Sequence, residues 1–390
     1  MTQLANGSRQ QIAIAEEQNF GVTPTANGKI FRFTSETLQK NVNQITSGEV
    51  EPSGMVTDRK KVGVTAQGDI SGEFSIGNLD SILEGVLRNN IDTYSITREM
   101  SYVVDGTKIT SATGDFTETF EPGMFILPKG FTEGADKFDK AVKITAVSEL
   151  ELTLDASDLN VAPTAETAEV TIAGKTIKNG TVLKSYAIEK FFSDVEKYIF
   201  YNGCIINQLN FNFPDQNVIT TDLSFAGSEE DVSETSIFTG YDDMTTNEIL
   251  DTSNNLPSVR FNDLSVPSQT FDLSINNNAR MNTAHGSQKA IAGSQGTQDI
   301  TGNMNVYFKD FTQYNLFKND TTISFDYQLE DKDGNLFVVS IPSAKITACP
   351  IVGGGKDTDV VASMSFGAIK DEELNYQIRI DQILKLEETE

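Results

Sequence analysis

Asp69-Ile70-Ser71-Gly72, in the first quarter of the chain, is matched by Asp299-Ile300-Thr301-Gly302 in the last quarter. At the same offset Asp80 aligns with Asp310, and Val86–Asn89 aligns with Leu316–Asn319. Similarity that keeps one offset over such a stretch indicates an internal repeat, which must be recognised before other patterns are interpreted.

A second block repeats at an offset of its own. Ser185–Glu189 matches Asp326–Glu330, and Leu223–Ala226 matches Met364–Gly367. Two copies of one unit can occupy two equivalent positions in a ring, so the repeat favours a role in assembly over a role in catalysis.

Both copies show the two-residue alternation that is typical of strands with one buried and one polar face. Ile70 and Phe74 in the first copy, and Ile300 and Met304 in the second, fall on the side predicted to be packed, since their burial drives folding. The opposite, polar side holds Asp69, Ser71, Glu73 and Ser75 in the first copy and Asp299, Thr301, Asn303 and Asn305 in the second.

One short helix is predicted in each copy. Apolar residues recur at helical spacing from Leu79 to Leu87, with Asn78 placed as a cap, and the second helix is expected near Asp310 to Lys318. Asp333-Gly334 lies between two alternating runs and predicts a tight hairpin. The predicted fold class is all-β with short helices, built from two repeated β-sandwich or barrel domains.

The two copies differ mainly by an insertion. Between the matching blocks the first copy runs from Asn90 to Lys184, whereas the second crosses the same gap from Asp320 to Phe325. Alternating runs inside the insertion predict a small β-barrel, which we expect to project outward and to be dispensable for assembly. The predicted domains are residues 1–89 with 185–235, the inserted barrel at 90–184, and residues 236–390 with a C-terminal arm.

The stretch from Gln39 to Ala66 has no clear periodicity, and a connection of that length is usually functional or disordered. We expect it to become ordered only on contact with an adjacent ring. It contains Arg59, Lys60 and Lys61, a basic cluster in an acidic chain. Two interpretations of the cluster remain open: a solvated loop, or contact with an acidic surface on another copy of the chain.

Charge and composition narrow the class of protein. Of the 390 residues 38% are hydrophobic, and the net charge is -26, from 30 Lys and Arg against 56 Asp and Glu. Binding of nucleic acid needs a basic surface, so the negative net charge argues against a nucleic-acid-binding protein. DNA could still slide past an acidic surface without being bound. No apolar stretch is long enough to cross a bilayer, and we expect no signal peptide. Cys204 and Cys349 are expected to be free, buried thiols.

Residue types argue against an enzyme. His285 is the single histidine, which excludes a multi-histidine metal cluster, and no carboxylate pair stands out as a general acid and base. Ile351–Asp357 resembles a phosphate loop, but Pro350 stands where the first glycine is needed and Asp357 replaces the required Ser or Thr. We therefore predict no catalytic residues, no metal site and no cofactor.

Several segments resemble the tail tube proteins of long-tailed bacteriophages, and their order and spacing carry the resemblance. The segments are Ile12–Glu17, Phe20–Pro24, Phe31–Leu38, Gly68–Phe74, Leu79–Glu84, Tyr201–Asn207, Phe225–Gly227, Gly302–Phe308 and Asn315–Phe317.

The resemblance implies a major tail protein: a structural virion protein that assembles in the host cytoplasm and resides in the virion tail. Proteins of this family form rings that stack into a hollow tube, through which DNA is ejected into the host. Their sheets join edge to edge around the lumen, which removes open strand edges. Single-repeat relatives close a ring with six chains, so a duplicated chain implies a pseudo-hexameric ring of three chains, with a hexameric ring as the alternative. The implied partners are the chain itself and the tape measure, tail tip and terminator proteins. DNA passes without specific binding, and no membrane is involved.

In such a tube the polar residues from Asp69 to Ser75 and from Asp299 to Asn305 are expected to line the lumen, where acidic and small polar groups would repel phosphates. Arg59, Lys60 and Lys61 are the expected inter-ring contact. The alternative function is a β-domain adhesin or surface-binding module of a virion, with the inserted barrel as its recognition part. The absence of tryptophan weighs against the exposed aromatic clusters that an adhesin would more often carry.

Overall fold

The computed structural model describes residues 4–103, 107–131, 138, 140–156, 165–256, 258–262, 264–266 and 268–383. Across these residues the chain is mostly β-structure, which confirms the predicted all-β class. The described α-helices are α1 (Asp80–Leu87) and α2 (Thr312–Lys318), close to the predicted ranges. Neither of these helices is long and apolar enough to span a bilayer.

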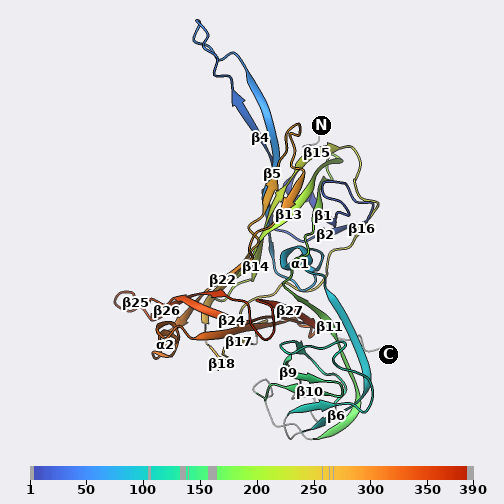
Figure 1. Cartoon of the computed structure of the whole chain (residues 1–390), viewed down its shortest axis with the longest axis vertical. Coiled ribbons are helices and arrows are strands. Elements are labelled where there is room, and N and C mark those ends of the chain that lie inside the picture. The colour runs from blue at the N-terminus through green and yellow to red at the C-terminus, as the bar shows by residue number, and fades with distance from the viewer. Residues whose placement is uncertain are drawn as a thin grey trace.

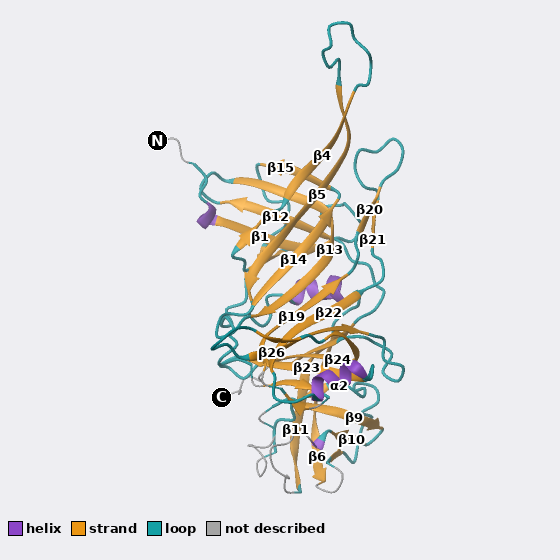
Figure 2. Cartoon of the chain, turned by 90° about the vertical axis from the view of Figure 1, so that its left-hand side faces the viewer, coloured by secondary structure: helices purple, strands orange, loops and turns teal. Residues whose placement is uncertain are grey.

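A continuous sheet crosses both halves of the chain (Figures 1 and 2). Its strands run in the order β5, β14, β13, β19, β22, β26, each antiparallel to the next. Their bounds are β5 (Arg59–Glu73), β14 (Thr220–Gly227), β13 (Lys197–Phe213), β19 (Ser268–Asn276), β22 (Asp299–Tyr307) and β26 (Val360–Ala368). The edge beside β5 carries β3 (Ser35–Glu36) and β4 (Gln39–Thr46), and the edge beside β26 carries β24 (Leu336–Ala348) and β25 (Ile351–Gly353).

Strand β13 belongs to two layers because its ladder is interrupted in the middle. Its second part, from Gln208 to Phe213, pairs with β19 in the continuous sheet. Its first part pairs with β12 (Tyr186–Phe192) and with β15 (Glu229–Ser233) in an outer layer. That outer layer continues through β1 (Gln10–Glu16), β2 (Gly28–Phe31) and β16 (Tyr241–Asp242).

The second half repeats this strand order. In the first half the succession is β5–β14–β13–β12–β1, and in the second half it is β22–β26–β24–β23–β17. The remaining bounds of the second half are β23 (Thr322–Glu330), β17 (Ser258–Phe261), β18 (Leu264–Ser265) and β27 (Arg379–Ile383). The hairpin between β23 and β24 turns at Asp333-Gly334, as predicted. The duplication stays a prediction, and this shared order is an observation in its favour.

The ladders also share their irregularities. Phe225 lies opposite Ile206, and Phe366 lies opposite Ile346; each pair is followed by a register shift at the same place. The offset predicted for this block, which places Leu223–Ala226 on Met364–Gly367, therefore describes the strands correctly.

The offset predicted for the other block is wrong by four residues in the strand. Gly68 pairs with Phe225, and Gly302 pairs with Phe366, so Gly302 corresponds to Gly68 and not to Gly72. A shift of four residues keeps every side chain on its own face, since strand side chains alternate with a period of two. The repeat in the sequence does not distinguish the two offsets, because both place the apolar and the polar residues on the same faces of the strand.

The inserted segment forms a small closed sheet with a core of its own. Its strands are β6 (Asp92–Val103), β7 (Lys108–Thr110), β8 (Phe125–Ile126), β9 (Val142–Ser148), β10 (Glu151–Leu154) and β11 (Glu166–Lys178). They pair in the order β11, β6, β7, β10, β9, β8. An isolated bridge between Lys129 and Thr171 leads from the β8 side back to β11.

The inserted segment is also tied to the second half. Lys175–Lys178 of β11 pairs with Arg379–Gln382 of β27, and Leu336, Val338 and Ile383 pack into the core of the insertion. A deletion from Asn90 to Lys184 would remove these partners, so the expectation that the insertion is dispensable applies only to a cut that leaves the β11–β27 pairing intact.

The predicted irregular stretch from Gln39 to Ala66 is a strand hairpin instead. β4 and the first part of β5 pair from Gln39 opposite Gln67 to Thr46 opposite Arg59, and the hairpin extends away from the body of the chain (Figure 1). Both of its faces are largely exposed toward the tip, so folding did not require apolar alternation there, and the sequence carried no strand signal.

A second hairpin lies beside the first. It consists of β20 (Arg280–Asn282) and β21 (Ala292–Ser294), which lie between β19 and β22 in the chain (Figure 2). The β4–β5 hairpin holds the corresponding place in the first half, between β3 and the part of β5 that belongs to the continuous sheet. The Val64 N–H donates to the Gln288 carbonyl (2.7 Å), which joins the base of the β4–β5 hairpin to the loop between β20 and β21.

The predicted capping role of Asn78 is wrong. Helix α1 begins after Leu79 without a side-chain cap, and Asn78 instead bonds the backbone N–H and carbonyl of Arg32. The apolar face of α1 is buried as expected, at Ile82, Leu83, Val86 and Leu87, whereas α2 has no buried residue.

Candidate functional site

The continuous sheet has one packed face and one face that no other described layer covers. Its packed face is mostly apolar, with Ile70, Leu223, Leu209, Leu273 and Ile300 all completely buried. We call the opposite side the polar face. It comprises Asp69, Ser71 and Glu73 on β5, Asp222 and Ser224 on β14, Gln208, Asn210 and Asn212 on β13, Thr270, Asp272 and Ser274 on β19, Asp299, Thr301, Asn303 and Asn305 on β22, and Ser363 and Ser365 on β26.

Side chains on the polar face are held by hydrogen bonds that cross the strands. Ser71 Oγ donates to Asp222 (2.6 Å), and Asn212 Nδ2 donates to the same carboxylate (2.9 Å). In the second half, Asn303 Nδ2 donates to Asp272 (2.9 Å), while its amide oxygen accepts from Ser365 (2.8 Å). Cross-strand pairs of this kind stabilise the sheet and fix the surface in one conformation.

The same pattern continues across the junction of the halves. Gln208 Nε2 donates to Asn210 and to Ser274, each at 2.8 Å, so the side chains link β13 to β19. Asn305 bonds Thr270 (3.0 Å) and accepts from Ser363 (2.8 Å). The polar face is therefore one surface shared by both halves.

The charge on this face has a single sign. Its charged residues are Asp69, Glu73, Asp222, Asp272 and Asp299, and the face has no Lys or Arg among the positions named above. Such a surface offers nothing to neutralise phosphates, so a polyanion is repelled from it rather than held by counterion release.

The structure places seven of the eight predicted polar residues on this face. Asp69, Asp299, Thr301 and Asn303 are exposed, and Ser71, Glu73 and Asn305 are half-buried. Ser75 is a correction: it lies beyond the end of β5 and is completely buried, with its hydroxyl bonded to Arg32 (3.1 Å) and to the Asn247 carbonyl (3.3 Å).

The sequence did not reveal which residues of neighbouring strands share the polar face. Asp222 and Asp272 belong to it, opposite Ser71 and Asn303. The available signal was the alternation of each aspartate with Leu223 and Leu273, but alternation reveals a polar side and not which strands lie next to each other.

The predicted basic cluster lies far along the hairpin from the polar face. Arg59 and Lys60 pair with Thr46 and Ile45 near the tip, and Arg59, Lys60 and Lys61 are all exposed. Exposed apolar residues accompany them, with Val50 98% and Met55 72% accessible. A tip that is both basic and apolar is suited to contact with another protein surface.

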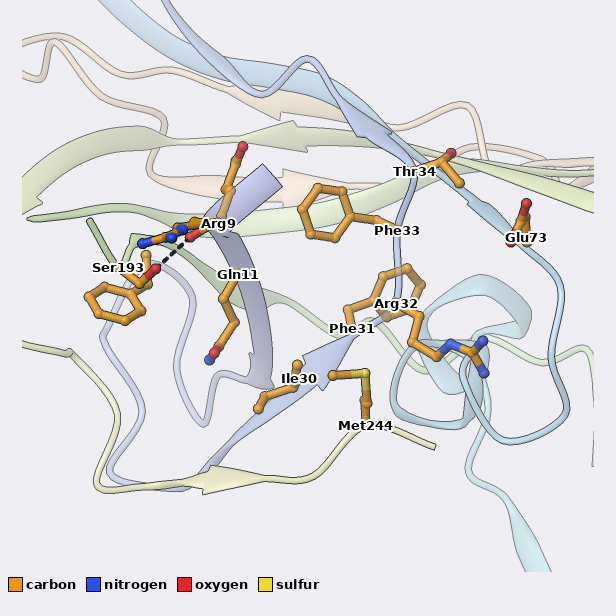
Figure 3. A pocket seen from close by; sticks show the side chains of 12 residues that line it. Arg9, Gln11, Ile30, Phe31, Arg32, Phe33, Thr34, Glu73, Ser193 and Met244 are labelled. Atoms are coloured by element: carbon orange, nitrogen blue, oxygen red, sulfur yellow. Dashed lines mark hydrogen bonds between the residues drawn. The ribbon is translucent and has the colours of Figure 1, made fainter. Parts of the chain in front are cut away.

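A groove of about 500 Å³ lies where the outer layer meets β5 (Figure 3). Its walls mix Phe31 and Phe33 with Arg9, Arg32 and Glu73, and Ser193 Oγ donates to the Arg9 carbonyl across one end (2.9 Å). The lining includes no histidine or cysteine. Within the described ranges no group of three or more His, Cys, Asp or Glu residues is placed to hold a metal.

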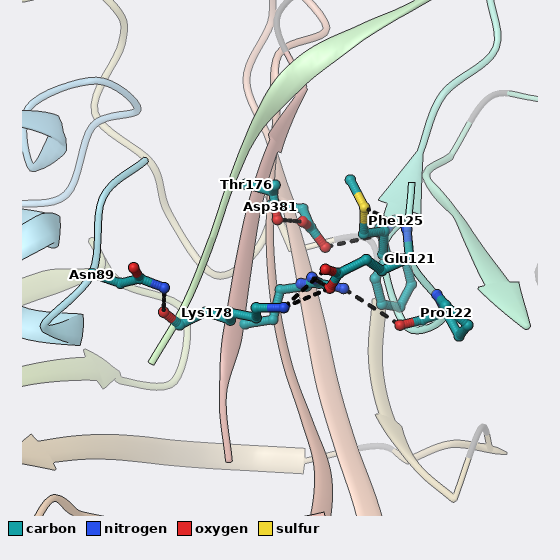
Figure 4. A network of polar contacts seen from close by, with 9 residues as sticks. Asn89, Glu121, Pro122, Phe125, Thr176, Lys178 and Asp381 are labelled. Carbon is teal, nitrogen blue, oxygen red and sulfur yellow. Dashed lines mark hydrogen bonds and ion pairs between the residues drawn. The ribbon is translucent and has the colours of Figure 1, made fainter. Parts of the chain in front are cut away.

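A partly buried polar network joins the insertion to the second half (Figure 4). Thr176 Oγ1 and the Phe125 N–H donate to the Asp381 carboxylate, at 2.5 and 3.0 Å. Beside it, Arg379 and Lys178 both bond Glu121 at 2.7 Å. Burial raises the pKa of Asp381 to about 6, although the charge of Arg379 and the two hydrogen bonds oppose the shift. These contacts satisfy groups at an internal junction, which indicates a structural role.

Cys204 and Cys349 are free and buried, as predicted. Burial raises the pKa of both thiols, so neither is activated as a nucleophile.

The model of the family described as phage tail tube protein matches residues 7–368. No curated protein matches the chain.

Proposed function

The chain belongs to the phage tail tube protein family, whose members are structural components of the virion tail, and from this premise we propose that it assembles as stacked rings into the conduit for DNA ejection. The observation that carries the proposal is the polar face. It spans both halves, it is acidic and hydrogen-bonded, and the apolar core and outer layer lie on the other side of the same sheet.

In a closed barrel the polar face can only point into the lumen. If the continuous sheet closes into a ring, the outer layer stays outside and the polar face lines the lumen. Seven of the eight predicted lumen residues lie on it, with Asp222 and Asp272 added and Ser75 removed. DNA phosphates would then slide past carboxylates and amides without specific binding.

We propose a ring of three chains. Each chain supplies two halves of corresponding strand order, so three chains give six quasi-equivalent positions. Six chains per ring is the alternative arrangement.

The hairpins suit contact between rings. The β4–β5 hairpin extends from the body with Arg59, Lys60 and Lys61 exposed, in a chain whose net charge is -26. We propose that this tip contacts an acidic surface of the adjacent ring. The other partners are the tape measure, tail tip and terminator proteins of the same tail, and DNA within the lumen.

Electron microscopy of the purified full chain, combined with native mass spectrometry, tests this function. We expect hollow rings or tubes and a ring mass of three chains. Monomers that remain single at high concentration would contradict the tube, and a ring mass of six chains would contradict the trimer alone.

A further inference from the structure

The junction between the two halves of one chain has counterparts at the two free edges of the continuous sheet. Inside the chain, the second part of β13 has β14 on one side and β19 on the other. Phe211 lies opposite Leu273, and on the polar face Asn212 lies opposite Asp272. This pairing joins the sheet of the first half to that of the second.

Strand β25 holds in the second half the place that the end of β13 holds in the first. Past the shared register shift, Asn212 pairs with Thr220, and Val352 pairs with Val361. Thr220 and Val361 correspond because each lies five residues before the phenylalanine of its strand, Phe225 or Phe366. Val352 is therefore the counterpart of Asn212.

The segment from Ser35 to Asn41 likewise holds the place of β19. Asp272 pairs with Asn303, the residue after Gly302. Thr37 donates its N–H to the carbonyl of Asp69, the residue after Gly68 (2.9 Å). Thr37 is therefore the counterpart of Asp272.

Both counterparts lie at open edges. Among the described strands, β25 pairs only with β26, and β3 and β4 pair only with β5. Open edges invite pairing with another chain. Apolar side chains are exposed at both places, including Val352 (56% accessible) on one edge and Val42 (41%) on the other.

Helix α2 supports the same junction independently. Helix α1 is covered partly by the segment that connects β19 to β22, because Asn277 and Gln298 both donate to the Val86 carbonyl. Among the described residues none covers helix α2 in this way, and Phe311, just before the helix, and Tyr314, within it, are exposed. The counterpart of the covering segment is the base of the β4–β5 hairpin, where Val42 and Val62 are exposed.

We propose that β25 of one chain pairs antiparallel with the segment Ser35–Asn41 of the next, with Val352 opposite Thr37, and that α2 docks on the base of the neighbour's β4–β5 hairpin. The inference rests on the proposed function and specifies which edges close the ring. The continuous sheet of each chain then runs into that of the next with the polar face on one side throughout.

In the single chain, side chains already bond the backbone carbonyl and N–H of Leu38 at this edge. Its carbonyl accepts from Lys190 Nζ (3.1 Å) and Tyr201 OH (2.9 Å), and its N–H donates to Glu36 (2.9 Å). Such partners protect an edge before assembly. Pairing with β25 replaces them at this residue.

Disulfide trapping tests the register. Residues directly opposite in an antiparallel pair have Cβ atoms close enough to bridge. We would oxidise assembled tubes of V352C/T37C and compare them with V352C alone and with V352C/N41C, where the second cysteine lies about 13 Å further along the same edge. The N212C/D272C pair is the positive control, because it should bridge within one chain.

We expect V352C/T37C tubes to give chains linked into dimers and trimers, at least about ten-fold more than V352C/N41C, since disulfide geometry is strict. Tubes that form without this linkage, or with equal linkage at both sites, would overturn the inference and leave the proposed function standing. Wild-type protein that forms neither rings nor tubes would overturn the proposed function itself. If the variants do not fold, a density map of wild-type tubes decides the point, by the strand found next to Ile351–Gly353.

Discussion

Gly302 lies directly opposite Phe366 across β22 and β26, and the aromatic ring occupies the space where a side chain would stand: a Cβ on Gly302 would come within 2.4 Å of it. The corresponding pair in the first half is Gly68 and Phe225. The two pairs fix how the halves correspond. At Gly68 the reason for glycine differs, because an added Cβ would come within 2.5 Å of the Leu38 backbone.

Gly302→Ala should destabilise the protein by about 1–3 kcal/mol, because the added methyl forces the ring or the strand to move. The matched control is Gly367→Ala, a position on β26 with no atom within 4 Å of the added Cβ. Chemical denaturation of the two variants measures the difference. Equal stability of both variants would contradict this packing.

The pH dependence of stability should change when Asp381 is replaced. The folded-state pKa of this acid, raised to about 6, lies above its unfolded value, so the unfolded chain releases this proton first as the pH rises. Through this group, stability is highest below the unfolded pKa and falls between about pH 4 and pH 6.

Asp381→Asn removes that titration. The stability advantage of wild type over Asp381→Asn should therefore shrink as the pH rises from about 4 to 7, by a total on the order of 3 kcal/mol. Urea denaturation at several pH values measures it. A difference that stays constant or grows with pH would show that the carboxyl is not held in this buried state.

Charge reversal at the hairpin tip should weaken stacking of rings. Replacing Arg59, Lys60 and Lys61 with Glu removes the proposed attraction to an acidic neighbour, and the loss should be larger at low salt, since screening limits such attractions to about 10 Å at roughly 0.1 M. Tube length by electron microscopy is the readout. Lys332→Glu, on an exposed turn, is the control, and tubes of normal length from the triple variant would contradict the contact.

Basic residues on the polar face should retain DNA. Asp69→Lys with Asp299→Lys places cations at two exposed positions of the proposed lumen, so tubes should still form but should hold short DNA, with retention that falls steeply as salt rises. Glu118→Lys with Glu149→Lys, at exposed positions of the insertion, has the same charge change. Equal DNA retention by both pairs would contradict the lumen assignment.

The sequence predicted what depends on local pattern and missed what depends on neighbours. Alternation at Ile70 and Ile300 identified the strand faces, and helical spacing identified α1, because burial leaves a period in the sequence. The β4–β5 hairpin was missed because exposed strands such as Gln39–Thr46 leave no such period. Ser75 was misplaced because alternation does not reveal where a strand ends, and Asp222 and Asp272 were missed because strand adjacency is set by long-range pairing.

A density map of wild-type tubes tests the central claim most directly. The account predicts three chains per ring, with the Asp69 and Asp299 side chains of every chain on the lumen wall and the inserted barrel on the outside. A map that places Asp69 and Asp299 on the outer surface of the tube would contradict it.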